Sequence, residues 1–154
     1  RSTLFPYTTL FRSGVIIKSR LFVAHVGDSR AYLFDSRANE LEVLTEDHTY
    51  VQQLLNAGEI TEEEAAVHPK RNLLFRAITG SDVEVDLLTR PLPNKGIFMV
   101  CSDGLWGHID HELMKKVIAA KNQSLQQKCE HLIAMAIEGG TTDNISVILT
   151  EFRL

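Results

Sequence analysis

The sequence predicts an α+β fold that is packed in layers, and three observations support this prediction. Strand-like apolar runs come first, at 21–26, 31–34 and 41–44, and two helix-like stretches follow them. From residue 83 onward, strand-like and helix-like segments alternate, but without the regular winding of a parallel sheet. The chain has 154 residues, a length that is typical of one domain.

The composition excludes several classes of protein. The chain has 16 Lys and Arg against 20 Asp and Glu, a net charge of -4, whereas nucleic-acid-binding domains show a basic excess or stripe. The longest apolar runs fall far short of the ~20 residues of a membrane-spanning helix, and no secretory signal is visible. Cys101 and Cys129 lie in a strand-like and a helix-like run, so we expect two reduced thiols and a cytoplasmic protein.

Turn and cap residues mark the elements of the first half. The apolar run 21–26 ends at Gly27, and the run 31–34 follows after four residues, which predicts a hairpin or another tight connection. Helical spacing of apolar residues then predicts a helix. A capping box that begins at Thr61 opens a second helix, which is short because Pro69 disfavours helix at the residue before it.

The second half alternates between strand-like and helix-like segments. Residues 83–87 alternate like a strand with one wet face, whereas 96–101 are apolar throughout, as in a strand that is covered on both faces. Asp110 and the capping box at Ser124 predict two helices. A last strand is predicted at 145–149.

Residues 1–13 differ in character from the rest of the chain. The segment repeats itself, with Thr9-Leu10-Phe11 after Thr3-Leu4-Phe5, and it contains neither an acidic residue nor a Met. It resembles translated adaptor sequence, so we predict a non-native leader over 1–13 and the C-terminal part of a domain over 14–154. We expect Phe5 and Phe11 to add little to the core, and we expect the chain to be an N-terminally truncated fragment.

Three aspartates share one local pattern. Asp28, Asp103 and Asp143 each lie beside a small or turn residue next to an apolar run, and we expect Ser102-Asp103-Gly104 to form a turn. Taken singly, each is typical of an ordinary turn aspartate. Taken together, converging carboxylates need a cation, and oxygen ligands suit Mg²⁺ and Mn²⁺. The residues alone therefore leave two alternatives, structural turns or a Mg/Mn hydrolase or transferase; no P-loop, GxGxxG or GxSxG motif competes.

Four longer strings contain these aspartates or lie between them. They are VGDSRAY at 26–32, DHT at 47–49, SDGLW at 102–106 and GTTDNISV at 140–147. In this order and with these gaps they resemble the motifs of the metal-dependent serine/threonine protein phosphatases, the type 2C or PPM family. The segment 56–72 resembles the helix-rich flap of the bacterial branch, so the resemblance covers essentially 14–154.

The resemblance implies a fold and a metal site. The fold would be a layered α-β-β-α sandwich, incomplete at its N-terminus, with two Mn²⁺ or Mg²⁺ ions at one end and a third, weaker one. Asp103 and Asp143 match the catalytic metal-binding carboxylates, and Asp28 matches the ligand of the third ion. The supporting residues around them would be Gly27, Ser102, Gly104 and Asn144. Arg30 is expected to form a structural ion pair, His48 to support the local turn, and Trp106 to pack in the core.

The resemblance also implies a function, namely hydrolysis of phosphoserine and phosphothreonine in proteins. The partners would be phosphorylated proteins in signalling, opposite a Ser/Thr kinase; we expect a monomer that binds no nucleic acid and has no membrane segment. The alternatives are a non-catalytic phosphatase-like regulatory or binding module and a phosphohydrolase of small molecules. The substrate-binding residues are unknown.

The chain departs from the family pattern at two places. The early Asp-Gly metal motif, whose carboxylate bridges both ions, has no counterpart in 1–13, and neither has the early phosphate-binding Arg. Position 107 is Gly, where some relatives have a further acidic ligand. We therefore expect the chain by itself to be a weak or inactive phosphatase.

Overall fold

A computed structural model describes residues 11–78 and 82–154 of the chain. The strands are β1 (Phe11–Ile17), β2 (Arg20–Val26), β3 (Arg30–Asp35), β4 (Glu40–Val43), β5 (Asp86–Pro91), β6 (Lys95–Cys101) and β7 (Val147–Arg153). The helices are α1 (Tyr50–Asn56), α2 (Glu62–Val67), α3 (Asp103–Trp106), α4 (His111–Ala119) and α5 (Leu125–Glu138). This order confirms the predicted α+β class.

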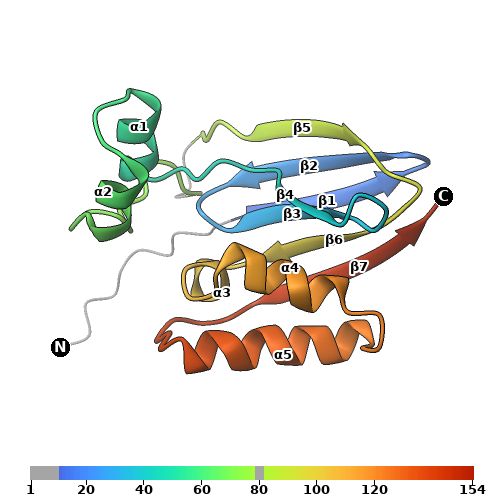
Figure 1. Cartoon of the computed structure of the whole chain (residues 1–154). Coiled ribbons are helices and arrows are strands. Elements are labelled where there is room, and N and C mark those ends of the chain that lie inside the picture. Colours follow the sequence, from blue (N-terminus) through green and yellow to red (C-terminus); the bar gives the residue numbers. More distant parts are fainter. Residues whose placement is uncertain (1–10, 79–81) are drawn as a thin grey trace.

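The strands form two antiparallel sheets (Figure 1), one with the order β1-β2-β5 and one with the order β4-β3-β6-β7. The connection between β2 and β3 is tight, which is one of the two predicted alternatives, but it is not a hairpin, because β2 and β3 belong to different sheets. The chain crosses between them at Gly27, whose φ of 110° is a conformation that residues with a side chain rarely adopt. Sequence spacing could not distinguish this crossing from a hairpin.

Two apolar cores lie on the two faces of the four-stranded sheet. Leu33 and Phe98 face the other sheet and pack with Leu21 and Val23 of β2. The alternate residues of the same strands face the helices, and this second core includes Tyr32, Phe34, Ile97, Met99, Met114, Ile118 and Leu132. β6 is therefore covered on both faces, as its continuous apolar sequence predicts.

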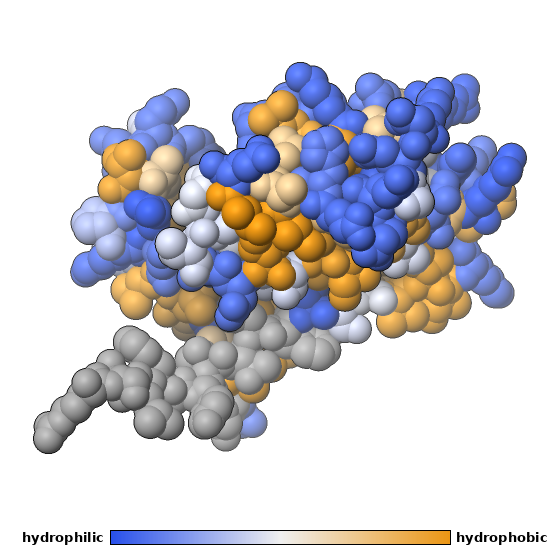
Figure 2. Space-filling model, turned by 90° about the horizontal axis from the view of Figure 1, so that it is seen from below, coloured by the Kyte–Doolittle hydropathy of each residue, from blue (hydrophilic) through white to orange (hydrophobic). Residues whose placement is uncertain are grey.

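The described residues form three layers, with helices on the four-stranded sheet only (Figure 1). Figure 2 views the helical side, where apolar atoms lie among hydrophilic ones. The outer face of the three-stranded sheet exposes Val15, Phe22 and Leu87, which are 50%, 40% and 79% accessible. The described residues thus match an α-β-β-α sandwich without its first helical layer. α1 and α2 lie beyond one end of the sheets.

The helix caps follow the sequence closely. Thr61 and Ser124 each accept from the backbone N–H three residues later, and both capping boxes are complete. Asp110 caps α4 through the amides of residues 112 and 113. Both cysteines are free thiols, as expected, and burial raises the pKa of Cys101 to about 12. Among the described residues, no helix is long and apolar enough to cross a bilayer.

Three strands begin at residues other than those predicted, because the neighbouring strand determines where each one begins. β5 begins at Asp86, opposite His25 near the end of β2, so the preceding residues have no strand beside them. β7 begins at Val147, opposite Cys101, where β6 ends. β1 begins at Phe11, so residues 11–13 pair with 24–26 although the leader was expected to extend to 13. The expectations for Phe5 and for the Phe11 side chain lie outside the described residues.

Candidate metal centre

The strand register brings the three predicted aspartates to one end of the sandwich. Arg30 lies opposite Cys101, and Cys101 lies opposite Val147. Asp28 comes shortly before Arg30 in the sequence, and Asp103 comes shortly after Cys101. Asp143 comes shortly before Val147. β2 and β6 both end on this side of the molecule, and α1 and α2 lie there as well (Figure 1).

Asp28 is the most buried of the three carboxylates, with 7% of its surface accessible. Its Oδ1 atom is buried and has no hydrogen-bond partner in the described part of the chain. Burial, followed by the nearby negative charges of Asp103 and Asp47, raises the pKa of Asp28 to about 6. A buried carboxylate oxygen without a partner, near a second carboxylate, is a site that a divalent cation would stabilise.

The segment with Asp143 lies against Gly104, the residue that follows Asp103. A Cβ atom built on Gly104 would lie 2.6 Å from the carbonyl oxygen of Asn144 and 3.3 Å from the Cβ of Asp143. The absence of a side chain therefore allows the segment with Asp143 to approach the start of α3.

Ser102 fixes the same approach from the other side. Its hydroxyl donates to the carbonyl oxygen of Asn144 (3.1 Å) and accepts from the backbone N–H of Ser146 (3.0 Å). The Ser102 N–H donates in turn to the Ser146 carbonyl at 3.0 Å. Asn144, which was expected to support the neighbouring carboxylate, contacts Ser102 through its backbone carbonyl. The predicted turn at 102–104 is wrong, because Asp103 and Gly104 begin helix α3.

A second network holds the Asp28 turn against α3. The indole N–H of Trp106 donates to the Asp28 carbonyl oxygen at 3.0 Å, and the Arg30 guanidinium lies 3.5 Å from the centre of the Trp106 ring. Arg30 also forms an ion pair with the buried Asp47, with Nη2 and Oδ2 2.9 Å apart. Arg30 is thus a structural cation, as predicted, and Trp106 packs against the helical core while also anchoring Asp28.

We expect Trp106→Phe to lower the free energy of unfolding by about 1–2 kcal/mol. The substitution removes one hydrogen bond to the Asp28 carbonyl and weakens the cation–π contact, and each contributes on the order of 1 kcal/mol. Urea unfolding followed by circular dichroism at pH 7 measures the change. An unchanged free energy of unfolding would show that the indole does not anchor this turn.

The three carboxylates do not form a closed ligand set by themselves. Within 11–78 and 82–154, no three His, Cys, Asp or Glu side chains lie close enough to hold a metal ion. The donors nevertheless suit a hard cation, because all three are carboxylates and one has an unpartnered buried oxygen. Two pairs of carboxylates could supply ligands together. One pair is Asp28 with Asp103, and the other is Asp103 with Asp143.

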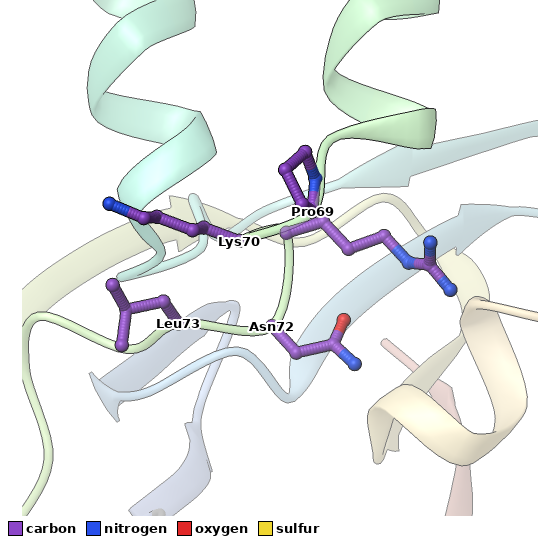
Figure 3. Close-up of a pocket in the computed structure, with 5 residues that line it drawn as sticks. Pro69, Lys70, Asn72 and Leu73 are labelled. Carbon is purple, nitrogen blue, oxygen red and sulfur yellow. The ribbon is translucent and has the colours of Figure 1, made fainter.

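A hollow of about 570 Å³ lies in the connection after α2, lined by residues 69–73. Figure 3 shows that the Lys70 and Asn72 side chains point to different sides of this connection. The Lys70 ammonium lies 5.3 Å from the ring centre of Tyr50 in α1. The labelled polar groups therefore do not converge on one ligand, and the hollow is no alternative reaction site.

Comparison with known proteins shows which proteins the chain resembles. The model of the family Protein phosphatase 2C matches residues 13–54. The serine/threonine phosphatase stp of Listeria welshimeri is 40% identical over 148 residues, which cover 96% of this chain and 57% of that protein. Over most of its length the chain is thus similar to bacterial serine/threonine phosphatases, and over residues 13–54 it is similar to the type 2C family.

Solved bacterial serine/threonine phosphatases share the fold described above. The crystal structure of the Mycobacterium tuberculosis phosphatase PstP/Ppp has a TM-score of 0.85 and 35% identity, over 92% of this chain and 59% of that one. A PstP catalytic domain in complex with 2 manganese ions has a TM-score of 0.81 and 33% identity, over 92% and 57%. The chain thus spans a little over half the length of these relatives.

Two residues near these aspartates make contacts that the sequence did not predict. Asp47 was noted only within the DHT string, and the structure pairs it with Arg30 behind the Asp28 turn. Trp106 was expected only to pack, and its hydrogen bond to the Asp28 carbonyl spans 78 residues of sequence. The two motif strings contain both residues, but only the tertiary structure shows which atoms meet.

Proposed function

We propose that this chain forms part of a metal-dependent protein phosphatase, which hydrolyses phosphoserine and phosphothreonine in proteins. The observation that carries the proposal is the placement of Asp28, Asp103 and Asp143 at one end of the sandwich, with an unpartnered buried oxygen on Asp28. In the proposal Asp103 and Asp143 bind the ion that takes part in hydrolysis. Asp28 contributes to a further, weaker site.

The residues of this end would act by holding and orienting charge. A bound Mn²⁺ or Mg²⁺ would lower the pKa of a water molecule and stabilise the negative charge of the phosphoryl oxygens. Ser102 and Gly104 hold the segment of Asp143 against the start of α3. Trp106 and Arg30 hold the turn that carries Asp28. These contacts would keep the ligands in place as the phosphorylated side chain enters.

Two other functions remain alternatives. A non-catalytic phosphatase-like module is disfavoured by the three retained carboxylates, since a decayed site would not need them. The names of the relatives favour a protein substrate over a small phosphate ester. We also propose a cytoplasmic monomer in signalling that acts opposite a Ser/Thr kinase and uses Mn²⁺ or Mg²⁺. Residues 14–154 would be the C-terminal part of its catalytic domain.

The proposal is tested by the release of phosphate from a phosphothreonine peptide by the 154-residue chain. We expect slow, Mn²⁺-dependent turnover, at least about a hundredfold below that of the Listeria welshimeri phosphatase, because the early bridging carboxylate has no counterpart in 1–13. Asp143→Asn should abolish the turnover. Turnover that is independent of Mn²⁺, or equal in Asp143→Asn, would contradict the proposal, and a preference for a small phosphate ester would favour the alternative substrate class.

A further inference from the structure

His48 connects the Asp28 turn to a distant segment of the chain. Its backbone N–H donates to the Gly27 carbonyl at 3.0 Å, and the Gly27 N–H donates to His48 Nδ1 at 3.1 Å. The side chain is buried and stacks on the His25 ring, with ring centres 4.5 Å apart. These two hydrogen bonds fix the residue directly before Asp28, and they confirm that His48 supports the local turn.

The second ring nitrogen of His48 points away from Gly27, toward Asp86. Because Nδ1 accepts a hydrogen bond, Nε2 carries the proton and donates to Asp86 Oδ2 at 3.0 Å. Asp86 also accepts from Arg76 Nη1 at 2.7 Å, and Arg76 contacts Glu84 as well. The imidazole therefore has one hydrogen bond to Gly27, beside Asp28, and one to Asp86, which also binds Arg76.

The backbone follows the same path. The Phe75 N–H donates to the His48 carbonyl at 3.0 Å, and the Tyr50 N–H donates to the Leu73 carbonyl at 2.8 Å. Thr49 and Leu74 form an isolated antiparallel bridge between these two hydrogen bonds. Residues 73–75 are thus hydrogen-bonded through their backbone to residues 48–50.

We propose that His48 is a positioning residue that couples the segment 69–76 to the Asp28 turn, so that metal binding at Asp28 and the order of this segment depend on each other. The inference rests on the proposed function, because it needs a cation at Asp28. A metal that fixes the Asp28 turn would hold Gly27, and through His48 it would hold Phe75 and Arg76. By linkage, a ligand that orders 69–76 would raise the affinity for the metal by the same factor.

Two substitutions of His48 each keep one of the two hydrogen bonds of the imidazole and remove the other. His48→Asn can keep an acceptor for the Gly27 N–H but is too short to reach Asp86, whereas His48→Gln can reach Asp86 but does not present the same acceptor to Gly27. His131→Asn is the matched control, since His131 is exposed on α5. Arg76→Gln tests the far end of the connection without changing His48 itself.

The measurements are Mn²⁺ affinity, by electron paramagnetic resonance, and hydrogen exchange of residues 69–76 with and without Mn²⁺. In the unsubstituted chain, Mn²⁺ should slow exchange of the Phe75 amide. We expect His48→Asn and His48→Gln to remove this response and to weaken Mn²⁺ binding about three- to tenfold, below the about 10–100-fold cost of losing a direct partner of a ligand. Arg76→Gln should reduce the exchange response, and His131→Asn should change neither quantity.

The outcomes separate this inference from the proposed function. If the unsubstituted chain binds Mn²⁺ at the Asp103 end but the His48 and Arg76 variants bind it equally well, with unchanged exchange at Phe75, the coupling is overturned and the proposed function stands. If the unsubstituted chain does not bind Mn²⁺, both are overturned. If a His48 variant fails to fold, Arg76→Gln decides the question by the same two measurements.

Discussion

Gly104→Ala is expected to weaken Mn²⁺ binding by about 10–100-fold and to lower the free energy of unfolding by about 1–3 kcal/mol. The added methyl group would lie 2.6 Å from the carbonyl oxygen of Asn144, which is backbone and has no rotamer to change. The segment with Asp143 must therefore move away from α3 and lose its hydrogen bond from Ser102. Calorimetric titration with Mn²⁺ and urea unfolding measure the two effects.

Gly58→Ala is the matched control for this prediction. Nothing lies within 4 Å of a Cβ at Gly58, but its φ of +68° is unfavourable for alanine. The substitution should therefore cost only the backbone strain of about 1–2 kcal/mol, with unchanged affinity for Mn²⁺. If Gly104→Ala binds Mn²⁺ as tightly as the unsubstituted chain, close approach at Gly104 is not what brings Asp103 and Asp143 together.

Asp28→Asn is expected to stabilise the metal-free chain at pH 7 by about 2–3 kcal/mol. The folded chain raises the pKa of Asp28 from 3.8 to about 6, chiefly by burial, and each pKa unit corresponds to about 1.4 kcal/mol. The folded state thus binds the proton more tightly than the unfolded state does. Ionisation of Asp28 therefore costs stability, which falls as the pH rises from about 4 to about 6 and then stays low.

The pH dependence supplies the control for Asp28→Asn. The gain in stability should be present at pH 7 and should vanish below about pH 3, where Asp28 is protonated in both states. Burial and the charge of Arg12 lower the pKa of His25 to about 4, and this titration has the opposite slope in the same range. His25 is common to both proteins, so the difference between them isolates Asp28. A variant that is less stable than the unsubstituted chain at pH 7 without metal would contradict the account.

Saturating Mn²⁺ should reverse the order of the two stabilities. The unsubstituted chain gains the binding free energy of the ion, whereas Asp28→Asn loses a ligand. Asp28 would then lower the stability of the metal-free chain and raise the stability of the Mn²⁺-bound chain. Functional sites commonly contain residues that destabilise the protein when its ligand is absent.

Local sequence rules predicted the parts of the fold that depend on neighbouring residues. The capping boxes at Thr61 and Ser124 form as expected, because each joins residues three positions apart. The same holds for the carboxylates at the strand ends, since a turn residue beside an apolar run marks the edge of a sheet. Local rules could therefore place Asp28, Asp103 and Asp143 beside strand ends, whereas only the resemblance to the phosphatase family implied that these ends meet at one side of the sandwich.

Tertiary contacts decided the parts that local rules could not predict. β2 and β3 are separated by three residues, yet they join different sheets, because each pairs with strands far along the chain. The start of β5 at Asp86 depends on where β2 ends. The contacts of Trp106 and Asp47 with the Asp28 turn likewise join distant residues whose side chains give no local pattern.

The most direct test of the metal site is an anomalous difference map from crystals of the chain grown with Mn²⁺, recorded near the manganese absorption edge. We predict a peak about 2 Å from carboxylate oxygens of Asp103 and Asp143, at the end of the sandwich where β6 leads into α3. In crystals of Asp143→Asn the peak should be weaker or absent. A peak bound by other residues, or no peak at saturating Mn²⁺, would contradict the assignment of these aspartates as metal ligands.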